Sequence, residues 1–310
     1  MKLFKRVELS HRSILLCAGT ALLIAQGIDT PAGSAQVNAR YPDGAHEIRV
    51  SAGESDIEAR DSIERAVTSI CEERVRDPKG SIPIDQMAVQ PPRPLSDPLV
   101  IAGKKRAERL LPAAKRLVPS VLGRLAAHYN LEALSHNWIL ARVKAVNTIK
   151  PEIEAHDNAY WRPNEPNVII LGTVFLAGIR SDEAMITVLA HELTHAVNGT
   201  DQALRPLFAR VETRASQIGN LSIQGEQAVE LTCETVGLQT MHAHTGKAAG
   251  KGTTRRLARA VGKNCVQRDI ADDSHLSPRQ TLRVLLALEP GVTKVIAMAR
   301  EKRHPRKVRD

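Results

Sequence analysis

The chain has 310 residues, which is enough for one sizeable domain with extensions. Hydrophobic residues make up 43 % and charged residues 25 %, as in ordinary globular proteins, and the lack of an internal repeat or a dominant low-complexity tract excludes solenoid and fibrous architectures. Aromatic residues make up only 3 %, so the core has to be built from Leu, Val, Ile and Ala, which favours helices.

Residues 1–35 have the pattern of a secretory signal peptide. A basic segment precedes an apolar run of 13 residues (SILLCAGTALLIA), which is too short to span a bilayer comfortably, and small residues lead up to Ala35. This pattern predicts cleavage after Ala35 and export to the periplasm or the extracellular space. An uncleaved anchor and a buried helix are the alternatives. No later segment has about 18 uninterrupted apolar residues, so we expect the mature chain to be soluble.

The positive charge is concentrated in two segments. The full chain has a formal net charge of +9. Residues Gly246–Arg268 contain seven Lys or Arg and no acid, and the tail of residues 300–310 contains six against two acids. Both segments are candidates for contact with an anionic envelope or membrane surface, although a solvated loop and a frayed tail have the same composition. No aromatic residue interleaves these charges, so we expect no nucleic-acid partner.

Four segments are predicted along the chain. Asp56–Val75 has helical apolar spacing and a proline-rich stretch follows it, so this region is interpreted as an appendage with an extended linker. In chain order the segments are a signal peptide (1–35), an N-terminal appendage with its linker (36–99), the main domain (100–299) and a basic tail (300–310).

The main domain begins with a helical pattern and then changes period. Ala102–Tyr129 has an apolar helical stripe that Pro112 and Pro119 are expected to break into pieces. Short alternating segments follow, two of them joined by the turn sequence RPNEPN. The strand candidates are Ile139–Val146, Ile153–Trp161 and Val168–Leu171.

Helices are predicted for the rest of the domain. Ser181 offers an N-cap, and the helix that follows is expected to stop at Asn198-Gly199. Further helices are predicted from Ile223 to His242 and after Ser277-Pro278. The predicted fold class is therefore α+β, predominantly helical, with helices packed on a small antiparallel sheet.

The cysteines allow one internal disulfide in the mature chain. Cys71, Cys233 and Cys265 remain after processing. In an oxidising compartment one pair can form a bridge and leave one thiol, and the sequence does not decide which pair.

The helix that starts at Ser181 contains a candidate zinc motif. His191 and His195 are four residues apart, which places both imidazoles on one helical face about 40° apart. This is the geometry that two ligands of a tetrahedral Zn²⁺ site require. Glu192 is displaced to the side, where it can take a proton from a water molecule without being a ligand. A helix with two solvent-facing histidines is the alternative, but the apolar surroundings predict burial.

The third ligand is expected on the next predicted helix. Glu226, Glu230 and Glu234 lie at i, i+4 and i+8 on one face, where like charges repel unless a cation lies opposite. Either Glu230 binds the metal and Glu234 orients a histidine, or Glu226 binds it and Glu230 orients, and a solvated acidic stripe remains the simplest alternative. Gly237 would allow this helix to pack closely on its neighbour.

These segments resemble the HtpX-like gluzincin peptidases, the family that includes the CAAX prenyl endopeptidase. Asn158-Ala159-Tyr160-Trp161-Arg162-Pro163, the strand VIIL and the helix SDEAMITVLAHELTHAV match the family's first motif. Glu230 matches its E-x-x-x-D ligand motif, with Glu234 in place of Asp. The double glycine of the turn and the membrane helices are missing. The resemblance implies zincin-type helices, favours Glu230 over Glu226, and describes a soluble, exported relative.

The expected function is that of a zinc-dependent endopeptidase acting on envelope or misfolded proteins, with one Zn²⁺ per chain and Glu192 as general base. A polypeptide substrate could add as a strand beside Asn158–Trp161 or Val168–Leu171. His275 is the first choice for the oxyanion donor, with Tyr160, His242 and His244 as further candidates. The alternatives are a zinc-stabilised chaperone-like or binding module with little turnover and a helical envelope protein with a fortuitous motif.

Overall fold

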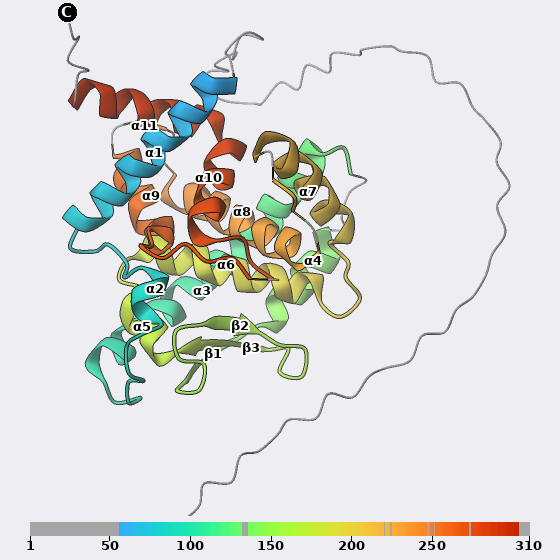
Figure 1. The fold of residues 1–310 in the computed structure, drawn as a ribbon. Coiled ribbons are helices and arrows are strands. Elements are labelled where there is room, and N and C mark those ends of the chain that lie inside the picture. The colour runs from blue at the N-terminus through green and yellow to red at the C-terminus, as the bar shows by residue number, and fades with distance from the viewer. Residues whose placement is uncertain are drawn as a thin grey trace, which may run out of the picture. The chain divides into compact units, whose positions relative to one another are not determined.

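The described part of the chain is predominantly helical, as its composition predicts. The computed structural model describes residues 56–131, 136–219, 221–223, 225–246, 249–250, 252–272 and 274–303 (Figure 1). These residues form helices and one small three-stranded sheet, which confirms the α+β class. The predicted signal peptide and the end of the basic tail lie outside the described residues.

The secondary-structure elements follow one another closely along the chain. The sheet strands are β1 (Thr148–Glu152), β2 (Ala159–Trp161) and β3 (Val168–Gly172). The helices are α1 (Asp56–Arg76), α2 (Ile84–Met87), α3 (Pro98–His128), α4 (His136–Ala145), α5 (Thr173–Gly178), α6 (Asp182–Asn198), α7 (Arg205–Gly219), α8 (Glu226–Thr245), α9 (Thr253–Val261), the 3-10 turn η1 (Gly262–Asn264), α10 (Pro278–Leu288) and α11 (Pro290–Arg303).

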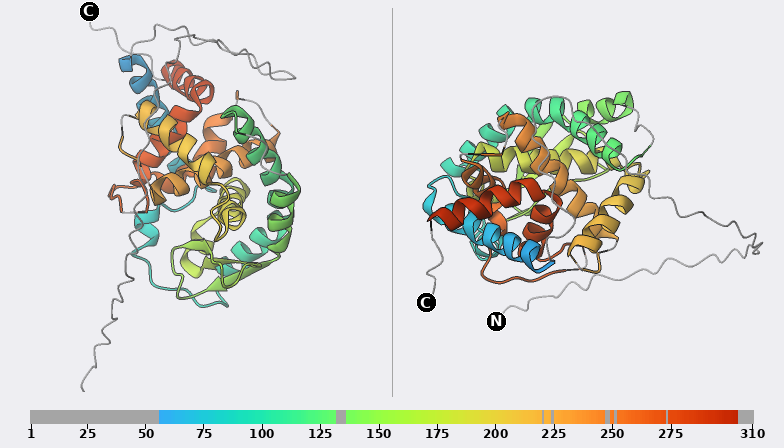
Figure 2. Two further views of the ribbon diagram at one scale, coloured as in Figure 1. Left: turned by 90° about the vertical axis from the view of Figure 1, so that its right-hand side faces the viewer. Right: turned by 90° about the horizontal axis from the view of Figure 1, so that it is seen from above.

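Helix α6 lies at the centre of the fold. As predicted, the Ser181 side chain accepts a hydrogen bond from the backbone N–H of Ala184, and the helix ends at Gly199, whose φ of 57° suits a residue without a side chain. Most of its side chains are buried, and it packs against α3 and α8. The sheet lies along one side of α6, whereas α1 and α11 lie beyond its other side (Figures 1 and 2).

The close approach of α6 and α8 depends on Gly237, as the sequence predicted. A Cβ atom at this position would lie 2.6 Å from the backbone oxygen of Thr187 in α6. Any side chain here would force the two helices apart, since a backbone atom cannot turn aside as a flexible side chain can. Gly237 therefore sets the spacing between the two helices that carry the candidate ligands.

The sheet is mixed, which corrects the predicted antiparallel arrangement. Its strand order is β1-β3-β2, with β3 parallel to β1 and antiparallel to β2. The turn between β2 and β3 forms the predicted hairpin. Because β1 pairs on the other side of β3, the central strand is β3 and the strand beside α6 is the edge strand β2.

The segment Ile139–Val146, which was predicted to be a strand, belongs mainly to helix α4. Its buried residues are Ile139, Val143 and Val146, spaced by four and three residues as on one helical face. The alternation of apolar and polar residues was therefore a misleading signal. Arg142 of α4 donates from Nη1 to the Val197 carbonyl at the end of α6, at 2.8 Å, so α4 supports the C-terminal turn of α6.

Helix α3 is continuous, although Pro112 and Pro119 were expected to break it. Each proline removes one backbone donor, but the apolar stripe of α3 packs on both α6 and α8. We attribute the continuity to this burial, which favours the whole helix over separate pieces.

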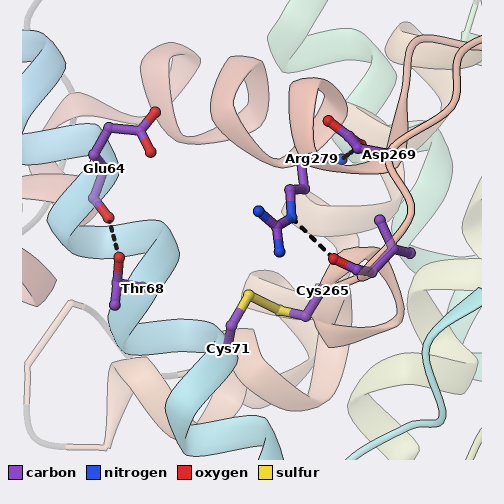
Figure 3. Close-up of a disulfide and its surroundings, with 7 residues drawn as sticks. Glu64, Thr68, Cys71, Cys265, Asp269 and Arg279 are labelled. Carbon is purple, nitrogen blue, oxygen red and sulfur yellow. Dashed lines mark hydrogen bonds between the residues drawn. A yellow bond between two sulfur atoms is a disulfide. The ribbon is translucent and has the colours of Figure 1, made fainter.

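Helix α1 belongs to the same compact unit as the rest of the described chain, which corrects its interpretation as part of an appendage. It packs against α9, α10 and α11. A disulfide joins Cys71 of α1 to Cys265, just after η1, and leaves Cys233 as a buried free thiol (Figure 3). The bridge spans 194 residues of sequence, and closing so long a loop favours the folded state by about 5 kcal/mol in the chain-entropy description.

Within the described residues, every helix is too short or too polar to cross a membrane.

We expect Gly237→Ala to lower the free energy of unfolding by about 1–3 kcal/mol, because its Cβ would collide with the Thr187 backbone. Gly123→Ala in α3 is the matched control, since nothing lies within 4 Å of the added Cβ; it should stabilise the protein by about 0.5–1 kcal/mol. Chemical denaturation of both variants measures the difference. Equal stability of the two variants would show that Gly237 does not set the helix spacing.

Candidate metal centre

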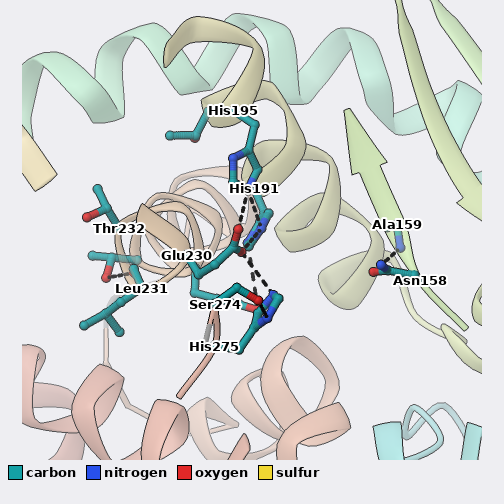
Figure 4. Close-up of polar contacts among 12 residues, drawn as sticks. Asn158, Ala159, His191, His195, Glu230, Leu231, Thr232, Ser274 and His275 are labelled. Atoms are coloured by element: carbon teal, nitrogen blue, oxygen red, sulfur yellow. Dashed lines mark hydrogen bonds and ion pairs between the residues drawn. The ribbon is translucent and has the colours of Figure 1, made fainter. Parts of the chain in front are cut away.

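Two histidines of α6 and one glutamate of α8 point toward one another at the centre of the candidate site (Figure 4). The Nε2 atoms of His191 and His195 lie 3.0 Å apart. The Glu230 carboxylate contacts both, with Oε2 3.0 Å from Nε2 of His191 and Oε1 3.3 Å from Nε2 of His195. Two nitrogen atoms from one helix and a carboxylate from the facing helix therefore converge, as catalytic metal sites require.

The thiol of Cys233 is a further candidate ligand that the sequence analysis did not consider. His191, His195 and Cys233 each offer one atom, and these atoms lie within 4.8 Å of one another, so this group could hold a metal ion. Burial raises the pKa of the Cys233 thiol well above its ordinary value, and nearby carboxylates, Glu230 first, raise it further. The thiolate, which is the metal-binding form, is therefore disfavoured before a metal arrives.

Glu226, the alternative third ligand, does not lie against the histidines as Glu230 does. It is exposed at the start of α8, and among the described contacts none joins it to either histidine. It lines the same cavity but is exposed. One turn of helix therefore separates Glu230, which contacts the histidines, from the exposed Glu226.

Glu192 is buried beside the two histidines. Glu192 is only 3 % exposed, and it lines the cavity that contains the site. Burial raises the pKa of Glu192, and the neighbouring His191 and His195 offset this only in part. A carboxylate with a raised pKa is a better proton acceptor near neutral pH than an exposed one, which suits a general base.

Glu234, the predicted orienting residue, lies near His191 but does not form a hydrogen bond with it. Its Oε1 is 3.9 Å from Nδ1 of His191, beyond hydrogen-bond distance. The same oxygen accepts a hydrogen bond from Lys263 Nζ at 2.7 Å. Burial raises the pKa of Glu234, but the charges of Lys263 and His191 outweigh burial and hold the pKa below its ordinary value.

Of the candidates for the oxyanion donor, His275 contacts the site, Tyr160 lines the cavity, and the other two do not line it. Nε2 of His275 lies 3.5 Å from Oε2 of Glu230, and its Nδ1 contacts Ser274 Oγ at 2.7 Å. Tyr160 lines the same cavity, but its hydroxyl donates to Glu152 at 2.6 Å. The two remaining candidates do not line this cavity; they are His242 and His244.

The cavity is large enough for a segment of polypeptide. Its volume is about 620 Å³, and both apolar and polar residues line it. The edge strand β2 forms part of the wall through Ala159, Tyr160 and Trp161. Apolar side chains such as Phe175 and Leu276 also line the cavity. The arrangement offers backbone hydrogen-bonding groups beside the candidate ligands.

The electrostatics of the site favour a cation. Burial lowers the pKa of His191, but the carboxylates of Glu230 and Glu192 outweigh burial and raise it to about 9. Burial raises the pKa of Glu230, but contacts with His191, His195 and His275 outweigh burial and hold that pKa far below its ordinary value. Glu230 is therefore ionised. Below its pKa, His191 is protonated, and a metal ion that binds this imidazole would replace the proton.

Much of the described part of the basic segment Gly246–Arg268 is helical. This helix is α9, which packs against α1 and α6. Arg255 Nε lies 2.9 Å from Glu73, and Arg259 Nε lies 2.7 Å from Asp77. Arg255 and Arg259 are therefore paired within the chain, and contact of the segment with an anionic surface stays a prediction.

Cys233 and Lys263 are the two site residues that the sequence analysis missed. Cys233 follows Glu230 by three residues, and this spacing on one helical face was a signal that could have been used. Lys263 was counted only as one charge of the basic segment. Nothing in the local sequence connects it with Glu234, because the two residues meet only in the tertiary structure.

Comparisons with models of protein families, with curated proteins and with solved structures found no match to this chain.

We expect binding of a divalent metal ion, probed with Zn²⁺, to strengthen as pH rises from about 7 to about 8.5. Below its pKa of about 9, His191 holds a proton that the metal must displace. The affinity should therefore increase about tenfold per pH unit, with release of at least one proton per ion. Competition with a chromophoric chelator at several pH values measures this slope. An affinity that does not change over this range would contradict the protonated state of His191.

Proposed function

We propose that this chain is a zinc-dependent endopeptidase, with His191, His195 and Glu230 as metal ligands. The observation that supports this most is the convergence of the two Nε2 atoms and the Glu230 carboxylate in a cavity that also contains the buried Glu192. A structural metal site does not need Glu192, whereas a hydrolytic site needs a general base beside its metal.

The donor set fits zinc better than the other common metals. Two imidazole nitrogens and one carboxylate form a ligand set known for catalytic zinc, whereas calcium and magnesium prefer oxygen atoms alone. Glu230 is preferred to Cys233 as the third ligand because its oxygens lie 3.0 and 3.3 Å from the two Nε2 atoms and because it is already ionised. Cys233 would first have to lose a proton in a buried position.

Two residues and the metal ion have distinct roles in the proposed hydrolysis. A bound zinc ion supplies Lewis acidity toward the scissile carbonyl group and a water molecule. Glu192 takes the proton of the attacking water and delivers it to the leaving amine. His275, whose Nε2 lies 3.5 Å from Glu230, would donate a hydrogen bond to the carbonyl oxygen as negative charge develops there. Contact with Glu230 raises the pKa of His275, which favours its protonated form as a donor.

The substrate is proposed to bind as a strand along β2. Of the two strand segments considered from the sequence, β3 is central and paired on both sides, so only β2 has an edge toward the cavity. Backbone pairing reads no side-chain sequence, which suits unfolded or misfolded polypeptides as substrates.

The compartment is proposed to be the cell envelope or the exterior. The Cys71–Cys265 disulfide is compatible with an oxidising location, where such bonds persist. The resemblance to HtpX-like peptidases and the signal peptide stay predictions, as does contact of the basic tail with an anionic surface.

We expect Glu192→Gln to abolish proteolysis and to keep the metal, because Glu192 is a base and not a ligand. Residues 36–310 would be assayed with unfolded casein, and zinc content measured by elemental analysis. A chain that holds zinc but cleaves no polypeptide, with Glu192 or with Gln, would favour the binding or chaperone-like module. Loss of zinc in Glu192→Gln would contradict the assignment of roles.

The third ligand is tested by comparing three alanine variants at a fixed free-zinc concentration. We expect Glu230→Ala to lose zinc, since only two histidines would remain. Glu226→Ala is the matched control from the same helix and should keep it. Cys233→Ala should also keep it, and a zinc-free Cys233→Ala protein would transfer the ligand role to the thiol.

A further inference from the structure

Lys263 is in contact with the candidate metal centre although it lies on a separate segment. Its Nζ donates to Oε1 of Glu234 at 2.7 Å, and the two side chains are only 12 % and 10 % exposed. The other oxygen of Glu234, Oε2, is buried and accepts no hydrogen bond within the described structure. Lys263 is therefore the group that satisfies this carboxylate.

The charge of Lys263 balances an excess of carboxylates that are largely buried. Glu192, Glu230 and Glu234 all line the cavity, and Lys263 is the lone lysine or arginine among the described residues of its wall. A divalent ion, the three carboxylates and Lys263 are formally neutral together. Without Lys263, the Glu234 carboxylate would be buried with neither a donor nor a permanent cation beside it, which is unfavourable.

The position of Lys263 is fixed from outside the cavity. Cys265, two residues later, is bonded to Cys71 of α1 (Figure 3). Gly262, one residue earlier, packs on the Arg74 side chain of α1, so closely that an added Cβ would lie 2.9 Å from Arg74 Cγ. Helix α1 therefore holds the 3-10 turn η1 on both sides of Lys263.

We propose that Lys263 is a positioning residue of the metal centre, which holds the Glu234 carboxylate beside Nδ1 of His191 and is itself held by the Cys71–Cys265 disulfide. A carboxylate next to the second nitrogen of a ligating histidine fixes the orientation of the ring. Glu234 has a longer side chain than the aspartate that the resemblance leads one to expect, so it needs a second contact to hold its carboxylate in one place. This inference rests on the proposed role of His191 as a metal ligand.

The test is a double-mutant cycle on zinc affinity, measured by chelator competition on the full mature chain. We expect Lys263→Met and Glu234→Gln each to weaken binding by about tenfold or more. The double variant should bind no more weakly than Glu234→Gln alone, because Lys263 acts through Glu234. Lys263→Arg should recover part of the loss. The spectrum of the Co²⁺-substituted protein should shift in Lys263→Met, which would report changed ligand geometry.

Lys115→Met is the matched control. Lys115 is a partly buried lysine that donates to the backbone oxygens of Lys144 and Val146, away from the cavity. Like Lys263→Met, this substitution removes a lysine that donates hydrogen bonds within the protein. It should leave zinc affinity unchanged, because Lys115 does not contact the site. Circular dichroism of the metal-free variants establishes that they are folded.

The disulfide is tested with Cys71→Ala/Cys265→Ala in the presence and absence of Lys263→Met. We expect the cysteine replacements to weaken zinc binding when Lys263 is present and to have no further effect in Lys263→Met. If the cysteine variant does not fold, the Lys263 cycle decides the proposal, because it leaves the disulfide intact.

Three results would overturn the inference in different ways. A wild-type chain without zinc affinity would overturn both the proposed function and the role of Lys263. The role of Lys263 alone would be overturned if Lys263→Met did not weaken zinc binding. It would also be overturned if Lys263→Met weakened zinc binding as much in the Glu234→Gln variant as in the wild-type chain. A folded cysteine variant with full affinity would remove the disulfide from the proposal and leave the Lys263–Glu234 contact.

Discussion

The contact between Gly237 and Thr187 sets how closely α8 can lie on α6. Because the backbones meet without an intervening side chain, the Glu230 carboxylate two turns earlier on α8 reaches both histidines of α6. The buried sides of the two helices, together with α3, form the centre of the hydrophobic core. The same packing that stabilises the fold therefore brings the candidate ligands together.

Burial of the site makes its negatively charged carboxylates unfavourable, and two kinds of cation compensate for this. Three of the carboxylates that line the cavity are largely buried, those of Glu192, Glu230 and Glu234, and each would be unfavourable there without a cation. Histidines and a bound metal ion can neutralise Glu230 and Glu192, whereas Lys263 neutralises Glu234. The site is thus strongly acidic by composition and close to neutral once its cations are in place.

Helix α1 is far from the candidate ligands in sequence but contributes to the structure around them. It packs against α9, α10 and α11, and the disulfide joins it to the segment that carries Lys263. Ion pairs from Arg255 and Arg259 to residues near the end of α1 strengthen this attachment. Helix α1, which was interpreted from the sequence as part of an appendage, therefore belongs to the structure that supports the candidate metal centre.

The sequence alone determined what depends on neighbouring residues. The ends of α6, the pair His191 and His195 on one helical face and the acidic face of α8 follow from local spacing and capping. Only the tertiary structure decided which glutamate meets the histidines, which cysteines pair, which strand lies at the edge and what neutralises Glu234. Each of these depends on contacts between segments that are distant in the chain, and local spacing does not encode such contacts. The same holds for α4, where burial against α3 and α6 favoured a helix although the apolar alternation had indicated a strand.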